Sequence, residues 1–214
     1  MLIALDASLF LFLNGLHAPY WDTFMYTFSQ MEVWIPFYAA LLWLMVRTWR
    51  KESGWVILAV VLCVVLADQV SSGLIKEWVQ RPRPTHTAGL QELVHTVNGY
   101  RGGRYGFVSS HAANTFGLAL FCTLLFRNRW YAWTMFLWAL VTSYSRIYLG
   151  VHFPGDILGG TLVGLGAAWL CYWLLRHFRP QAVQRSGIQQ MWILYLPLGV
   201  LAVTVLVIAV YSAF

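Results

Sequence analysis

Long apolar stretches, separated by short polar connections, constrain the fold of this chain more than any other feature. Five of them cover residues 55–74, 109–126, 130–149, 154–175 and 191–214, and a sixth covers about residues 32–48. An α-helix needs about 20 apolar residues to cross a bilayer. Because 59% of the 214 residues are hydrophobic and only 10% are charged, polar groups are too few to cover a water-soluble domain of this size. The sequence predicts an all-α, multi-span transmembrane helical bundle of about six spans.

The N-terminal segment is apolar but short, and Asp6 and Asn14 interrupt it. No basic residue precedes its apolar part, as a cleaved secretory signal would require. We therefore expect residues 1–31 to be an N-terminal interfacial helical segment that lies in the plane of the membrane surface. Residues 32–178 are expected to form the transmembrane core, and residues 179–214 a cytoplasmic loop followed by the last transmembrane helix.

The basic residues predict the orientation of the chain in a cell (inner) membrane. Eight of the fourteen lie in three short connections that alternate spans place on one side: Arg47, Arg50, Lys51, Arg127, Arg129, Arg176, Arg179 and Arg185. Lys and Arg accumulate in cytoplasmic loops, so that side is expected to be the cytoplasm. The net charge of +6 is thereby explained by orientation and by anionic lipid head groups, and no nucleic-acid partner is expected.

The other six basic residues fall at the extracytoplasmic (periplasmic) end, against this bias: Lys76, Arg81, Arg83, Arg101, Arg104 and Arg146. Because Lys and Arg are less frequent on the extracytoplasmic side, we expect these residues to have a function there. Three polar clusters lie there, and alternate spans bring them to the same membrane surface. They are Lys76 with Arg83-Pro84, then Ser109-Ser110-His111, then Ser145-Arg146 with His152 and Asp156.

These clusters predict phosphoryl-transfer chemistry. The fork of an arginine guanidinium matches phosphate oxygens, and a helix that starts near Ser109 would offer free backbone N–H groups to an anion. His152 and Asp156 are four residues apart, so the carboxylate can orient the imidazole as a nucleophile, while His111 serves as the general acid. No Gly-rich nucleotide loop and no carboxylate cluster for two metals is present. Neither a metal nor a cofactor is expected.

The same residues resemble the type 2 phosphatidic acid phosphatase (PAP2) superfamily, which includes vanadium haloperoxidases and bacterial acid phosphatases. The patterns K-x6-RP and SR-x5-H-x3-D match in full, whereas in the pattern PSGH Val108 replaces the proline and Ser110 the glycine. The resemblance implies a PAP2/haloperoxidase-like core and a phosphohistidine at His152, supported by Asp156, with His111 as the acid. It implies that phosphate is bound by Lys76, Arg83, Ser109, Ser110 and Arg146.

The expected function is hydrolysis of a membrane lipid phosphate, and the family implies undecaprenyl diphosphate, lipid A, phosphatidylglycerol phosphate or phosphatidate as candidate substrates. Phosphoryl transfer to a second lipid at the same site is the main alternative. A lipid transporter or non-catalytic binder is a weaker one, because it does not need the pair of His152 and Asp156. The sequence leaves the oligomeric state and the role of loop 85–108 open.

Two further assignments concern charged residues near these clusters. Asp68, inside the second span, either steadies a cation of the active site or accepts a hydrogen bond from a neighbouring helix; the sequence leaves both open. Arg81, Arg101 and Arg104 are expected to be solvated loop charges rather than ligands of a second phosphate or of a sugar.

Overall fold

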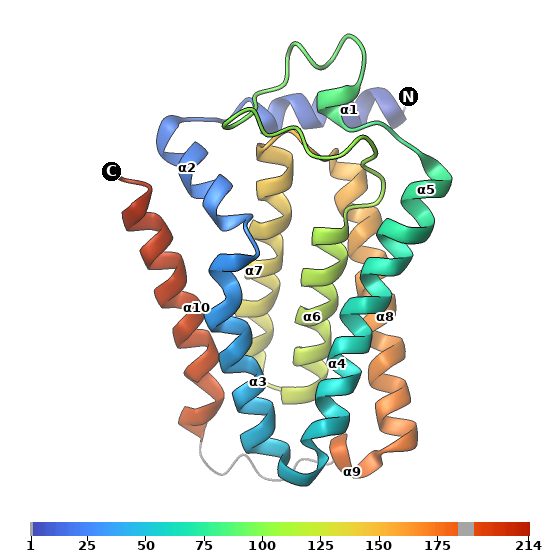
Figure 1. Ribbon diagram of the computed structural model, residues 1–214, viewed down its shortest axis with the longest axis vertical. Helices are drawn as coiled ribbons and strands as arrows, with labels where there is room; N and C mark the ends of the chain where they lie inside the picture. The colour runs from blue at the N-terminus through green and yellow to red at the C-terminus, as the bar shows by residue number, and fades with distance from the viewer. Residues whose placement is uncertain (1, 184–190) are drawn as a thin grey trace.

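The computed structural model describes residues 2–183 and 191–214. Over these residues the six long helices of the bundle are α3 (Ile35–Trp49), α4 (Ser53–Asp68), α6 (Ser110–Phe126), α7 (Arg129–Tyr148), α8 (Pro154–Phe178) and α10 (Met191–Tyr211). They run side by side along the long axis of the molecule (Figure 1). Length and apolarity mark Glu32–Val79, which contains both α3 and α4, as well as Pro154–Phe178 and Trp192–Tyr211 as candidate membrane spans; Ser110–Phe126 is a shorter apolar helix. The predicted all-α bundle is confirmed.

Tight turns make successive helices antiparallel neighbours. The helix α3 ends at Arg50, whose φ of +46° stops the α-helical hydrogen-bonding pattern, and one 3-10 turn (Arg50–Glu52) leads into α4. Asn128 begins α7, because its side chain accepts hydrogen bonds from the backbone N–H groups of Trp130 and Tyr131 at 2.9 and 3.1 Å. Such N-caps satisfy backbone donors that the helix itself leaves unpaired.

The helices α6 and α8 pack closely because small residues line their contact. A Cβ atom added to Gly160 would collide with the carbonyl oxygen of Ser109, and one added to Gly164 with that of Ala113. Glycine at these positions lets two helix backbones approach each other. The first turns of α6 and α8, which carry the cluster Ser109-Ser110-His111 and Asp156 of the third cluster, are thereby held together.

The second span is longer than the sequence predicted. Beyond Asp68 the chain continues as a π-helix (η3, Gln69–Ile75) and then as α5 (Lys76–Val79), which ends at Gln80 with a φ of +51°. The apolar stretch was expected to end at residue 74, with Lys76 at the end of the same helix, and the structure places Lys76 on that helix. Inserted π-helical turns are frequent at functional sites.

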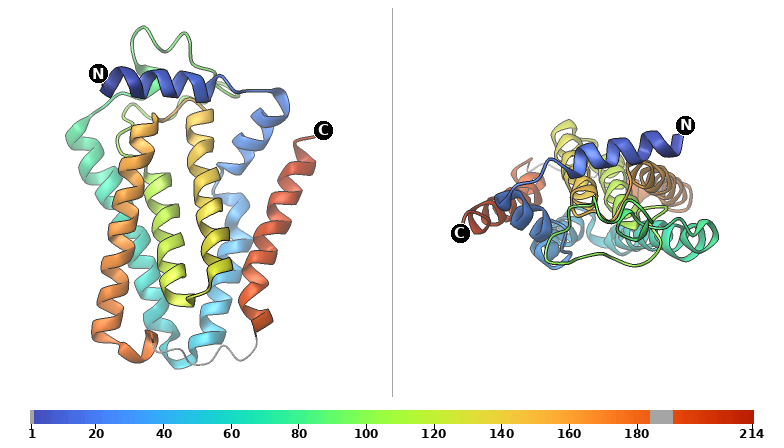
Figure 2. Two further views of the ribbon diagram at one scale, coloured as in Figure 1. Left: turned by 180° about the vertical axis from the view of Figure 1, so that it is seen from behind. Right: turned by 90° about the horizontal axis from the view of Figure 1, so that it is seen from above.

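The end of the bundle that carries the polar clusters is covered by N-terminal elements. The helix α1 (Leu2–Asn14) lies across this end, nearly perpendicular to the bundle (Figures 1 and 2). Phe10 anchors it by packing with Ile147 and Phe153. A separate helix, α2 (Pro19–Phe28), packs against α7 and α10; the sequence had not resolved it. The division into segments 1–31, 32–178 and 179–214 stays a prediction.

The connections rich in basic residues lie at the other end of the bundle. The turns from α3 to α4 and from α6 to α7, and the end of α8 with α9 (Pro180–Val183), are all opposite α1 (Figure 1). Of the eight basic residues assigned to the cytoplasmic side, Arg185 lies outside the described residues. The other seven belong to these connections or to the helix ends beside them.

Candidate active site

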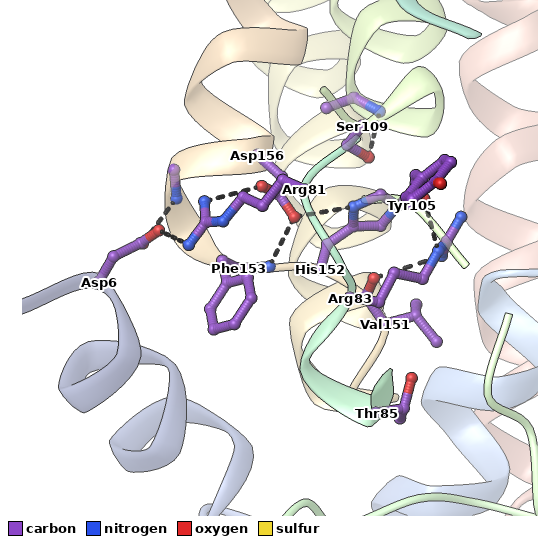
Figure 3. Close-up of polar contacts among 12 residues, drawn as sticks. Asp6, Arg81, Arg83, Thr85, Tyr105, Ser109, Val151, His152, Phe153 and Asp156 are labelled. Carbon is purple, nitrogen blue, oxygen red and sulfur yellow. Dashed lines mark hydrogen bonds and ion pairs between the residues drawn. The ribbon is translucent and has the colours of Figure 1, made fainter. Parts of the chain in front are cut away.

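The structure brings the three polar clusters together beneath α1. His152 lies in the loop between α7 and α8, and its Nδ1 is 3.3 Å from Oδ2 of Asp156 in the first turn of α8. Ser109, the N-cap of α6, donates its backbone N–H to the carbonyl oxygen of Asp156 at 3.0 Å. The exposed fractions of His152, Asp156 and Ser109 are 1%, 0% and 0%. Ser109 of the second cluster thus forms one buried unit with His152 and Asp156 of the third (Figure 3).

The contact with Asp156 orients the imidazole of His152. Oδ2 of Asp156 also accepts the backbone N–H of Phe153 at 3.0 Å, so the carboxylate is fixed on its own helix. With Nδ1 facing the carboxylate, Nε2 is the ring nitrogen that can react. Burial, reinforced by the nearby charges of Arg83, Arg146 and Lys76, lowers the pKa of His152 well below its ordinary value. The ring is therefore neutral and nucleophilic at physiological pH.

Arg83 is held by backbone carbonyl groups on two sides. Its Nε donates to the carbonyl oxygen of Tyr105 at 3.0 Å, and its Nη1 donates to that of Val151 at 3.3 Å (Figure 3). Burial lowers the pKa of Arg83, and the guanidinium of Arg146 lowers it further. Two buried guanidinium groups close enough to repel each other form a site that an anion would stabilise.

Arg146, near the end of α7, is 3% exposed. Its Nη2 donates to the hydroxyl oxygen of Tyr100 at 2.8 Å, whereas its buried Nε has no partner among the described residues. A buried N–H without an acceptor costs free energy, which a phosphate oxygen would recover. Tyr100, in loop 85–108, had not been predicted as a residue of the site.

His111 and Ser110 begin α6 and line a hollow together with Asp68. Asp68 accepts a long hydrogen bond of 3.5 Å from the side-chain amide of Asn114 on α6. Lys76 lies close enough to His152 to contribute to its lowered pKa. Across residues 2–183 and 191–214, no three His, Cys, Asp or Glu side chains lie together in an arrangement that could hold a metal ion.

The prediction that Arg81 is a solvated loop charge is wrong. Its Nη1 lies 3.0 Å from Oδ1 of Asp156, its Nη2 lies 2.7 Å from Oδ2 of Asp6 on α1, and its guanidinium stacks on the ring of Phe153 at 4.1 Å. Asp6 also accepts the backbone N–H of Gly155 at 2.8 Å. Figure 3 shows Arg81 lying between the two carboxylates. One signal marked Asp6: it is the only charged residue of α1.

Arg101 and Arg104 are exposed, as expected of loop charges. Arg101 donates from Nη2 to the carbonyl oxygen of Thr85 at 2.8 Å, and its own carbonyl oxygen accepts from the Thr85 hydroxyl at 2.9 Å. The guanidinium of Arg104 lies 5.5 Å from the centroid of the Tyr105 ring. These contacts lie within loop 85–108 and stabilise its conformation.

The chain is similar to known phosphatases over most of its length. It is 42% identical over 173 residues (79% of this chain, 76% of the relative) to the lipid A 4'-phosphatase of Bacteroides thetaiotaomicron. It is 37% identical over 207 residues (91% and 88%) to the lipid A 4'-phosphatase of Porphyromonas gingivalis. The crystal structure of Aquifex aeolicus LpxE superposes with a TM-score of 0.58 at 27% identity, covering 77% of this chain and 92% of that one.

A family model agrees with these similarities. The model of the PAP2 superfamily matches residues 54–180, a range that includes all three polar clusters. By this match and by its similarity to the two curated relatives, the chain belongs to the PAP2 superfamily.

Proposed function

We propose that this protein is a membrane lipid phosphatase that hydrolyses the 4'-phosphate ester of lipid A through a phosphohistidine intermediate. The observation that carries the proposal is the buried, neutral His152, oriented by Asp156 at 3.3 Å and surrounded by cations. Membership of the PAP2 superfamily and similarity to two lipid A 4'-phosphatases support the lipid substrate and favour lipid A among the candidates.

The first step transfers the phosphoryl group to the enzyme. Nε2 of His152 attacks phosphorus in line with the scissile bond, so the N–P bond forms as the bond between phosphorus and the sugar oxygen breaks. His111, on the leaving-group side, is protonated when the phosphate dianion lies beside it. It gives this proton to that oxygen, and the alcohol departs. Asp156 stabilises the positive charge that develops on the imidazole.

The second step regenerates the enzyme. The now neutral His111 accepts a proton from a water molecule, whose oxygen attacks phosphorus as the N–P bond breaks and inorganic phosphate forms. Arg83, Arg146 and Lys76 offset the negative charge on the non-bridging oxygens in both steps. Donors fixed in advance around such a charge supply much of the catalysis of phosphoryl transfer.

The surroundings of His111 suit a substrate that arrives from the membrane. A hollow of about 190 Å³ beside His111 shares Met31, Tyr38, Asn114, Thr115 and Trp138 with a groove of about 310 Å³. That groove is lined mainly by apolar side chains of α3, α4 and α6. If the acyl chains of a lipid lay in this groove, its phosphate would lie at the polar end, near His111. Lys and Arg accumulate in cytoplasmic loops, and the connections rich in basic residues lie at the opposite end of the bundle. This supports a site at the periplasmic side of the inner membrane.

The function can be tested with purified protein in detergent micelles that contain a chelator. Release of inorganic phosphate from a lipid A precursor, phosphatidylglycerol phosphate, phosphatidate and undecaprenyl diphosphate would be measured together with transfer to an added acceptor lipid. We expect free phosphate, fastest from lipid A, and an acid-labile 32P label on the enzyme. Phosphate recovered only on a second lipid would overturn hydrolysis in favour of phosphotransfer.

Two substitutions make this test specific. His152→Ala should abolish turnover and the 32P label, because the nucleophile is lost. His177→Ala is the matched control, since His177 is exposed at the opposite end of α8; it should keep the activity of the original protein. Unchanged turnover in His152→Ala would contradict the mechanism.

A further inference from the structure

The hollow beside His111 is separate from the phosphate-binding cations. Its lining includes His111 and Ser110 but none of Arg83, Arg146 or His152. In an in-line displacement the nucleophile and the leaving group lie on opposite sides of phosphorus. With His152 as the nucleophile and His111 as the acid, the hollow lies on the side of the leaving group.

Most hydroxyl groups in this hollow already donate to their own helices. Thr115 donates to the carbonyl oxygen of His111 at 2.8 Å, and Thr142 donates to that of Trp138 at 2.9 Å. Ser29 donates to the carbonyl oxygen of Tyr26 at 3.1 Å. Because each of these hydroxyl protons is already donated to a backbone carbonyl group, the three side chains have no free proton to donate to a ligand.

Within residues 2–183 and 191–214, two other polar groups of the hollow have no partner, and a third, Asp68, is only weakly bonded. Among the described residues, the buried Oδ1 of Asn114 has no donor and the buried Nε1 of Trp138 has no acceptor. Asp68 makes no ion pair within the described part of the chain, and its contact with Asn114 at 3.5 Å is at the limit of a hydrogen bond. Polar groups in such positions inside a membrane protein are costly unless a ligand satisfies them.

We infer that this hollow binds the leaving alcohol of the substrate and that Asp68 selects a neutral alcohol bearing hydroxyl or amide groups, such as a sugar. This inference rests on the proposed function and names the group that accompanies the phosphate. Hydroxyl and amide N–H groups of a sugar donate to Asp68 and to Oδ1 of Asn114. An amide carbonyl group of the same sugar accepts from Nε1 of Trp138.

The charge of Asp68 discriminates against a different class of substrate. When a prenyl diphosphate is cleaved, the leaving group is itself a phosphate anion, and it would occupy the same hollow. Two like charges in a poorly hydrated space repel each other strongly. A carboxylate at this position therefore disfavours diphosphates while it binds the donors of a sugar.

Kinetics on two substrates test this inference: a lipid A precursor with a 4'-phosphate and farnesyl diphosphate in the same micelles. We expect Asp68→Asn to lower kcat/KM for the sugar phosphate and to spare or raise it for the diphosphate. The ratio of kcat/KM for the sugar phosphate to kcat/KM for the diphosphate should fall by about tenfold or more, because the loss of a hydrogen bond to a charged group has an effect of this size. Trp138→Phe and Asn114→Leu should shift the ratio in the same direction, by about threefold to tenfold each.

Glu77→Gln is the matched control, because it removes an equal charge from the exposed surface of α5 outside the hollow. It should leave both substrates unaffected. An equal loss on both substrates in Asp68→Asn, Trp138→Phe and Asn114→Leu would show a structural role and overturn the inference. Failure of the proposed function is a distinct result, because the original protein would then release no phosphate from the lipid A precursor.

Discussion

The guanidinium of Arg81 lies 3.0 Å from the carboxylate of Asp156, although 75 residues separate the two in the chain. The same guanidinium reaches Asp6 of α1 at 2.7 Å. The residue that orients His152 is thus connected through one arginine to the helix that covers the site. Partners of this kind fix the orientation and charge of a reacting group without touching the substrate.

Arg81→Gln should lower kcat by about 10- to 100-fold with little change in KM, because Asp156 would lose a cationic partner and its fixed position. Arg81→Lys should recover part of the loss. Adding Asp6→Asn to Arg81→Gln should cost little more, since both changes break one network. Steady-state phosphate release is measured for these three variants and for the original protein. Arg104→Gln is the control, and a loss in it as large as in Arg81→Gln would contradict a specific role.

Gly155→Ala tests the contact between α1 and α8 without removing a charge. The added Cβ would lie 2.8 Å from Oδ2 of Asp6, which must move, whereas a Cβ at Gly166 on the same helix meets no atom within 4 Å. We expect Gly155→Ala to lower kcat several-fold and Gly166→Ala to leave it unchanged. Thermal unfolding in detergent separates the effect on activity from an effect on stability. Equal activity in both variants would show that α1 does not influence the site.

The lowered pKa of His152 gives a pH dependence with a definite sign. The folded protein keeps the ring neutral below the ordinary value of 6.5, whereas the unfolded chain binds a proton there. This residue therefore contributes stability above pH 6.5 that is lost as the pH falls toward its folded pKa. In NMR spectra, the imidazole resonance missing from His152→Asn should not shift as the pH falls through 6.5. A midpoint at or above 6.5 would contradict the buried neutral ring.

The orientation of the chain can be tested with single cysteines, since the three native cysteines Cys63, Cys122 and Cys171 are buried. Arg104 in the long loop and Arg176 near the end of α8 are both exposed. A maleimide that cannot cross membranes should label Arg104→Cys in intact spheroplasts, but Arg176→Cys only after the membrane is permeabilised. The reverse pattern would place the site in the cytoplasm.

The helices and the residues of the polar clusters were accessible from the sequence. Long apolar stretches allow few arrangements in a bilayer, because every backbone N–H and C=O group must be paired within a helix. Antiparallel spans then necessarily return His111 and His152 to the same surface. The pairing of His152 with Asp156 is also local, because the carboxylate in the first turn of α8 faces back toward the residues that precede the helix.

The partners of these residues were decided by the tertiary structure alone. Arg81 contacts Asp6 and Asp156 because α1 lies across the bundle, and no spacing in the sequence specifies the direction of an interfacial helix. The unsatisfied groups of Asn114 and Trp138 share one hollow with Asp68 only because α4, α6 and α7 pack around it. Whether a residue prefers water or lipid, and which hydrogen bonds it can form, follow from its type and can be inferred from the sequence. Contacts between distant segments depend on how whole helices pack, which no single segment encodes.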